Sequence, residues 1–133
     1  MDTPATSAEI DAALVAWARC LNDGEYFEAH EALEGVWLTA TEPDRTFLKG
    51  LIHVAASLHH HQRGNQHGTR AKHQSAVRYL TPYLPAYRGV ALAELLEELA
   101  EYLSGPNPLS PFPAREGGTD SVRTTAYPLR EVG

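Results

Sequence analysis

The stretch 22–37, with the sequence NDGEYFEAHEALEGVW, constrains the fold of this chain most strongly. Its apolar residues recur at helical spacing, and the arc they cover is wide enough to be a buried face. Asn22 precedes Glu25 by three residues, as in a capping box, so a helix should start near Gly24 and run to about Thr39. The stretch therefore predicts an amphipathic helix that packs against other elements.

Two ionisable side chains fall inside the apolar arc of this helix. His30 and Glu34 are four residues apart, so they are neighbours on one face, between Phe27 and Trp37. A carboxylate is costly to bury unless it is paired, and a neighbouring imidazole meets that need. A buried pair of this kind can be purely structural and fix the helix register, or it can belong to a site. For the second case, we predict a pocket formed by His30, Glu31, Glu34, Trp37 and Tyr26.

The rest of the chain predicts an all-α fold, a compact bundle of about five helices with a Pro-rich C-terminal tail. Apolar residues at helical spacing place the other helices near residues 7–21, 44–63, 66–80 and 90–103. Thr6 and Asn65 are suited to cap the first and fourth of the five predicted helices. Gly50 and Ser57 lie on one stripe, where they either admit a close neighbouring helix or are simply tolerated. Prolines and glycines beyond Leu103 forbid regular helix, so we expect a helical domain over 1–103 and an extended tail over 104–133.

Composition limits the function. The 133 residues fit one domain, and 43% apolar with 21% charged residues is typical of a soluble globular protein. The net charge of −6 argues against a nucleic-acid partner, which needs a basic face. The single cysteine, Cys20, rules out an internal disulfide and a Cys-rich zinc site. We expect no signal peptide, no membrane span and a cytoplasmic location.

The chain has seven histidines, which is many for this length. Each one taken alone is better explained as solvated or structurally satisfied. A metal site would need residues from two helices, and its candidate ligands are His30, Glu34, His59, His53 and His60. Such a set suits a divalent transition metal with one position open for water, and Glu31 would be the general base. HEALE differs from the zinc motif H-E-x-x-H, because Glu34 stands where that motif has its second histidine.

The two segments NDGEYFEAHEALEGVW and FLKGLIHVAASLHHHQRGN together resemble the domain of unknown function 309 family, small all-helical proteins of bacteria and archaea. The resemblance covers about residues 22 to 70. The matching positions are Gly24, Tyr26, His30, Glu31, Glu34, Trp37, Gly50 and a histidine at 59 or 60. This chain has His53 where the family often has glutamine. The resemblance implies a compact helical bundle and no particular activity.

Two functions follow as hypotheses. The first is a non-enzymatic helical module that binds a ligand or partner in a pocket floored by His30, Glu31 and Glu34. The second is a metal-dependent hydrolase that uses a His/Glu site between the second and third helices. A homo-oligomer is a further option, which exposure of Trp17, Trp37 or the stripe of small residues would support.

Overall fold

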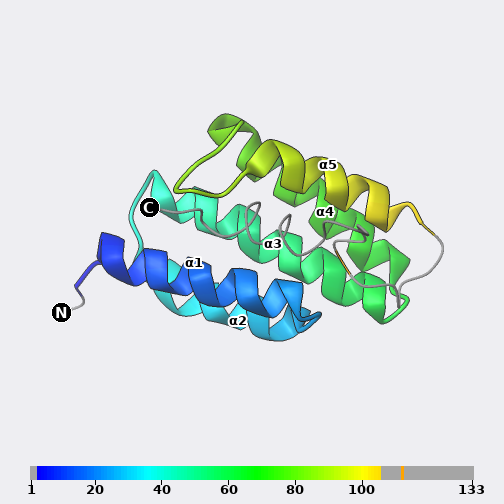
Figure 1. Ribbon diagram of the computed structural model, residues 1–133, viewed down its shortest axis with the longest axis horizontal. Helices are drawn as coiled ribbons and strands as arrows, with labels where there is room; N and C mark the ends of the chain where they lie inside the picture. Colours follow the sequence, from blue (N-terminus) through cyan, green and yellow to red (C-terminus); the bar gives the residue numbers. More distant parts are fainter. Residues whose placement is uncertain (1–2, 106–111, 113–133) are drawn as a thin grey trace.

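The computed structural model describes residues 3–105 and residue 112. The predicted all-α bundle is confirmed, because these residues form five α-helices and one short 3-10 helix (Figure 1). The elements are α1 (Ser7–Asn22), α2 (Tyr26–Trp37), α3 (Asp44–Gln62), α4 (Gln66–Leu80), η1 (Thr81–Tyr83) and α5 (Leu92–Leu103). No helix of the described part is long and apolar enough to cross a membrane.

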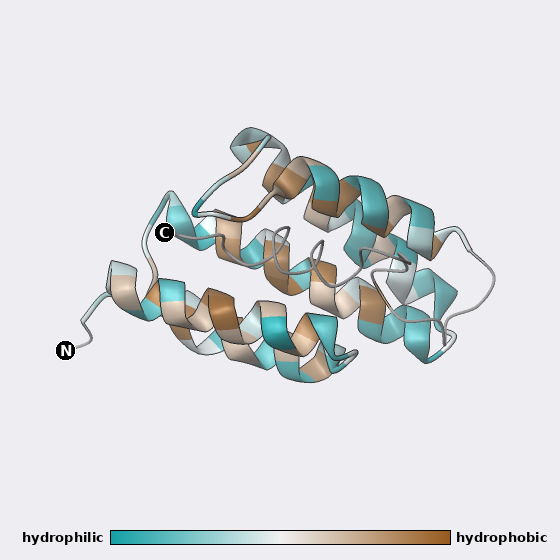
Figure 2. Ribbon diagram, in the orientation of Figure 1, coloured by the Kyte–Doolittle hydropathy of each residue, from teal (hydrophilic) through white to brown (hydrophobic). Residues whose placement is uncertain are grey.

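Helix α3 lies in the middle of the bundle. Helices α1 and α2 form a hairpin on one side of it, and α4 and α5 lie on the other side (Figure 1). Hydrophobic and hydrophilic residues alternate around each helix, as amphipathic packing requires (Figure 2). The core includes Trp17 from α1, Leu33 from α2, Phe47 from α3, Leu80 from α4 and Leu95 from α5, each fully buried. The tail predicted over 104–133 lies outside the described residues except for its first two residues and Phe112, whose buried ring packs on Tyr102.

Three predicted helix starts can be compared with the structure. Thr6 and Glu9 form the expected capping box, with reciprocal hydrogen bonds of 2.9 and 3.1 Å. The Asn65 side chain accepts a hydrogen bond from the backbone N–H of Gly68, as predicted. The predicted cap at Asn22 is wrong, because α1 continues through Asn22 and α2 starts after Glu25 without a side-chain cap. Between the two helices Gly24 reverses the chain at a φ of 79°, a conformation that glycine adopts easily.

The stripe of small residues on α3 admits α4. A Cβ atom placed on Gly50 would lie 2.5 Å from Cγ and Cδ2 of the buried Leu80, so the helices approach closely here because residue 50 has no side chain. Ser57 is also buried, and its hydroxyl donates to the carbonyl oxygen of Val54. Trp17 is fully buried as well. Neither Trp17 nor this stripe therefore offers a surface for self-association.

The segment between η1 and α5 is tied to two helices through Arg88. Its guanidinium donates to both carboxylate oxygens of Asp44 on α3, at 2.9 and 3.2 Å, and to Asp11 on α1 at 2.7 Å. The Tyr87 hydroxyl also donates to Asp44 at 2.8 Å. Since Arg88 and Asp44 are only 17% and 20% exposed, this network joins α1, α3 and the connecting segment at one end of the bundle.

Candidate functional site

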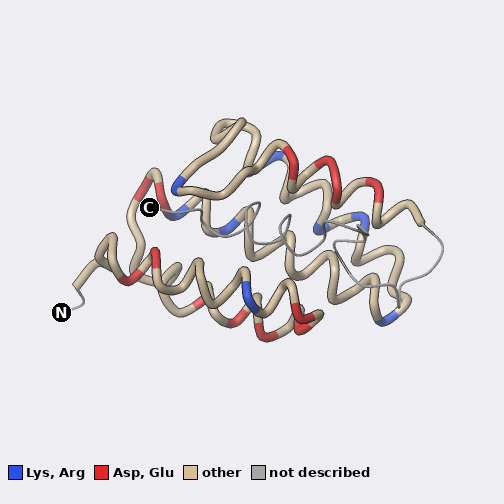
Figure 3. Tube along the Cα trace, viewed as in Figure 1, with Lys and Arg blue, Asp and Glu red and all other residues tan. Residues whose placement is uncertain are grey.

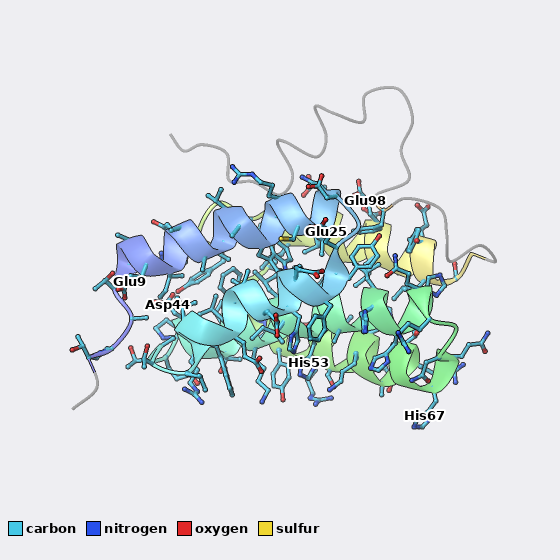
Figure 4. The ribbon with its side chains drawn as sticks, turned by 90° about the horizontal axis from the view of Figure 1, so that it is seen from below. Glu9, Glu25, Asp44, His53, His67 and Glu98 are labelled. Carbon is cyan, nitrogen blue, oxygen red and sulfur yellow. The ribbon has the colours of Figure 1, made fainter. Side chains whose placement is uncertain are left out.

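A surface groove of about 340 Å³ lies between α2 and α3, with one residue of α4 at its edge. Figure 4 shows the bundle from below with His53, one of the lining residues, labelled. The lining residues are Phe27, His30, Glu34 and Trp37 from α2, Lys49, Ile52, His53, Ala56, His59 and His60 from α3, and Lys72 from α4. We call this feature the α2–α3 groove.

The groove collects most of the predicted site residues. His30, Glu34 and Trp37 line it, together with His53, His59 and His60, the three histidine candidates on α3. Two further predicted pocket residues lie elsewhere. Tyr26 is 3% exposed and belongs to the core. Glu31 is exposed and is not part of the lining, because it lies about 100° around the helix from His30.

The expectation that His30 and Glu34 form a buried pair is wrong, because the Glu34 side chain is exposed. The Nε2 atom of His30 and Oε2 of Glu34 are 4.0 Å apart, but the side chains are 27% and 48% exposed. Helix α2 buries Ala29 and Leu33 instead, so the pair lies on the groove side of the packed face. The ring of Phe27 stacks on His30 with centroids 5.8 Å apart and is itself 47% exposed. The pair thus forms a groove wall.

Cations and aromatic rings alternate beside this wall. The guanidinium of Arg45 lies 4.2 Å from the centre of the Trp37 ring, and Nζ of Lys49 lies 4.9 Å from it. Lys49 also lies 5.9 Å from the ring of Tyr79, which Arg78 approaches at 5.3 Å. These contacts are favourable cation–π interactions. Within the described ranges, none of these three cations forms a salt bridge with an acid.

Two of the groove histidines, His53 and His59, have a lowered pKa. Burial, followed by the positive charges of Lys72, Lys49 and Arg78, lowers the pKa of His53 to about 4. Burial likewise lowers the pKa of His59, with smaller contributions from neighbouring positive groups such as Arg63. Both rings are therefore uncharged at pH 7 and can donate or accept a hydrogen bond.

Three ring nitrogens of groove residues are buried without a hydrogen-bond partner among the described atoms. They are Nε1 of Trp37, Nδ1 of His30 and Nδ1 of His53. A buried polar group without a partner costs about 1–3 kcal/mol, and most such groups in folded proteins are satisfied. Buried ring nitrogens of His61 and His73, outside this groove, also have no partner among the described atoms, so the property is not confined to the groove.

The metal hypothesis receives no support from this geometry. In the part of the chain that the structure describes, no group of three or more His, Cys, Asp or Glu residues is arranged to hold a metal ion. The candidates His30, Glu34, His53, His59 and His60 share the groove, but successive histidines on a helix diverge. Lys49 and Lys72 also line the groove, and their charges oppose a bound cation.

Lys49 and Lys72 are not among the site residues predicted from the sequence. One signal for Lys49 was present, because it precedes His53 by four residues and so shares its helix face. No local signal identifies Lys72, which reaches the groove from α4 only because α4 folds back along α3. A second depression, of about 650 Å³, lies beside the start of α4 and the end of α5, and none of the predicted site residues lines it.

Fold and groove together define an all-α bundle protein with a mixed aromatic, imidazole and lysine groove between its second and third helices. Residues 14–71 match the family described as Domain of unknown function (DUF309), so the resemblance seen in the sequence is confirmed over that segment. The segment runs from α1 into α4 and contains every lining residue of the α2–α3 groove except Lys72.

A similar protein is an uncharacterised protein of Aquifex aeolicus (strain VF5). It is 33% identical to this chain over 83 residues, which cover 62% of the chain and 25% of the relative. The matched segment therefore spans about a quarter of that protein. Neither comparison states an activity, so the function has to be argued from the groove.

Proposed function

We propose that this protein is a binding module and that the α2–α3 groove takes a small molecule or a short segment of a partner. The observation that carries the proposal is the groove itself, a concave surface between α2 and α3 where aromatic, imidazole and lysine side chains lie together. The groove volume of about 340 Å³ lies within the range of ligand sites, which are usually apolar with a few polar groups. Phe27, Ile52 and Ala56 supply the apolar part of the lining.

The alternative, a metal-dependent hydrolase, is supported less well. Its general base was to be Glu31, which does not line the groove that holds the histidines. Its ligands were to be the groove histidines and Glu34, which do not form a cluster of three in the described residues. Metal analysis of the purified, untagged protein, together with thermal shifts in added zinc, manganese or nickel, tests this alternative. Stoichiometric metal with a raised melting temperature would revive it.

The binding proposal is tested by filling the groove. Ala56→Leu places a larger side chain in the lining, whereas Ala12→Leu adds the same atoms to an exposed position on α1. A fragment library is screened by ¹⁵N NMR, with the two indole N–H signals as reporters, since Trp37 lines the groove and Trp17 is buried in the core. Trp37→Phe assigns the two signals.

We expect bound fragments to move the Trp37 signal and leave that of Trp17 in place. Ala56→Leu should weaken these fragments at least about tenfold, or roughly 1.4 kcal/mol, and Ala12→Leu should leave their affinity unchanged. The proposal is wrong if no fragment moves the Trp37 signal, or if those that do bind equally well to Ala56→Leu.

A further inference from the structure

The chain has only two lysines, Lys49 and Lys72, and both line the α2–α3 groove. They reach it from different helices, α3 and α4. Both also lie close enough to His53 for their charges to lower the pKa of that imidazole. Two ammonium groups therefore border one groove although 22 residues separate them in the sequence.

The charge around the groove is opposite in sign to that of the whole chain. The chain has a net charge of −6, and Figure 3 shows acidic residues along α5 and around the corner between α1 and α2, with Lys and Arg on α3 and α4. Glu34 is the only acid of the lining, so two lysines and one carboxylate leave a local charge of +1. Arg45 and Arg78 add positive charge beside it, on the rings of Trp37 and Tyr79.

Like charges held together repel one another, and the described residues provide Lys49 and Lys72 with no acid within salt-bridge distance. A cleft lined by one sign of charge concentrates ligands of the opposite sign. Both lysines of this acidic protein line the same concave surface.

We propose that the α2–α3 groove recognises a small organic anion that carries an apolar arm. The anionic group, a carboxylate or a phosphate, pairs with Lys49 and Lys72. The apolar arm packs on Phe27 and Ile52. This inference rests on the proposed binding function and names the chemical class of its ligand.

The other groove residues suit such a ligand. The Trp37 ring lies 4.9 Å from the ammonium group of Lys49, so this cation is held beside the groove. His53 is neutral at pH 7, so it contributes a hydrogen bond and no further charge. Phe27 is 47% exposed, and contact with an apolar arm removes its ring from water.

The test uses four probes of similar shape with the full chain at pH 7: 3-phenylpropanoate, phenyl phosphate, 3-phenylpropanol and 3-phenylpropylamine. Reductive ¹³C-methylation labels the two lysines, and with the indole N–H signals it places each probe. We expect at least one of the two anions to shift the Trp37 and lysine signals and to bind at least about tenfold more tightly than the alcohol. The amine should bind most weakly, and added salt should weaken the binding of the anions only.

Three variants separate charge from shape. Lys49→Met and Lys72→Met keep most of the side-chain length. Each should lower the affinity for the anions several-fold and leave the affinity for the alcohol unchanged. Arg19→Met removes a cation from α1, away from the groove, and should change nothing. Far-UV circular dichroism and melting temperatures establish that all three variants fold.

The outcomes distinguish the two proposals. If the alcohol or the amine binds at the Trp37 signal as tightly as the anions, or if the lysine variants bind the anions normally, the anion proposal is wrong and the binding module stands. The same holds if an acidic peptide or a short DNA duplex binds there and the small anions do not. If no molecule of any charge reaches the Trp37 and lysine signals, the binding function itself is wrong. A preference between carboxylate and phosphate identifies which anionic group the site favours.

Discussion

Replacing two helical glycines by alanine should have opposite effects on stability. In α2, a Cβ atom on Gly35 would meet no other atom within 4 Å. In α3, a Cβ atom on Gly50 would lie 2.5 Å from Cγ and Cδ2 of Leu80 and 3.2 Å from Cβ of Tyr79. Leu80 is fully buried, so it cannot move aside without disturbing the core.

The magnitudes follow from two opposing terms. Alanine is favoured over glycine inside a helix by about 0.5–1 kcal/mol, and this term acts in both variants. Overpacking a core typically costs about 1–3 kcal/mol, and it acts only at Gly50. Gly35→Ala should therefore stabilise the protein by about 0.5–1 kcal/mol. Gly50→Ala should destabilise it by about 1 kcal/mol, so the two variants differ by about 2 kcal/mol.

Urea unfolding, followed by far-UV circular dichroism, measures both free energies. A double-mutant cycle adds the physical cause, since Leu80→Ala should cost less in the Gly50→Ala background, where the new methyl group occupies part of the vacated space. If Gly50→Ala raises stability as much as Gly35→Ala does, the close approach of α3 and α4 is not real and the placement of Lys72 beside the groove loses its basis.

Three further predictions concern charged groups. Arg88→Met should cost about 2 kcal/mol or more in urea unfolding, because it leaves the largely buried Asp44 carboxylate without its bidentate partner. Hydrogen bonds from Arg88 lower the pKa of Asp44. This carboxylate therefore stabilises the fold above about pH 4, and its contribution is lost as the pH falls through the lowered pKa. Asp44→Asn should be less stable than the wild-type protein at pH 7 and should lose less stability on acidification. The pKa of His53 is lowered to about 4, so between pH 6.5 and 4 the unfolded state binds more protons than the folded state, and stability decreases as the pH is lowered. In His53→Gln this loss of stability should be smaller by about 1–2 kcal/mol, allowing for solvent screening of a half-buried ring. An imidazole of His53 that titrates near pH 6.5 by NMR would contradict this prediction.

The helices were predictable because their signals are local. The capping box at Thr6 and the cap at Asn65 lie within three residues of their partners, and the apolar spacing of each helix is visible in its own sequence. The cap at Asn22 was predicted wrongly although a local signal for the alternative was present. Asn22 is the last residue of α1, and Gly24, with its positive φ, ends that helix as a C-terminal glycine does.

The sequence alone determined that this chain forms amphipathic helices and that His30, Glu34 and Trp37 share one side of the second helix, since helical spacing fixes which residues are neighbours within a helix. Only the tertiary structure decided that this side borders an open groove instead of the core, and that Lys49 and Lys72 face it together. The physical reason is that contacts between helices depend on how closely they approach. At the α3–α4 contact, that distance is set by the absence of a side chain at Gly50.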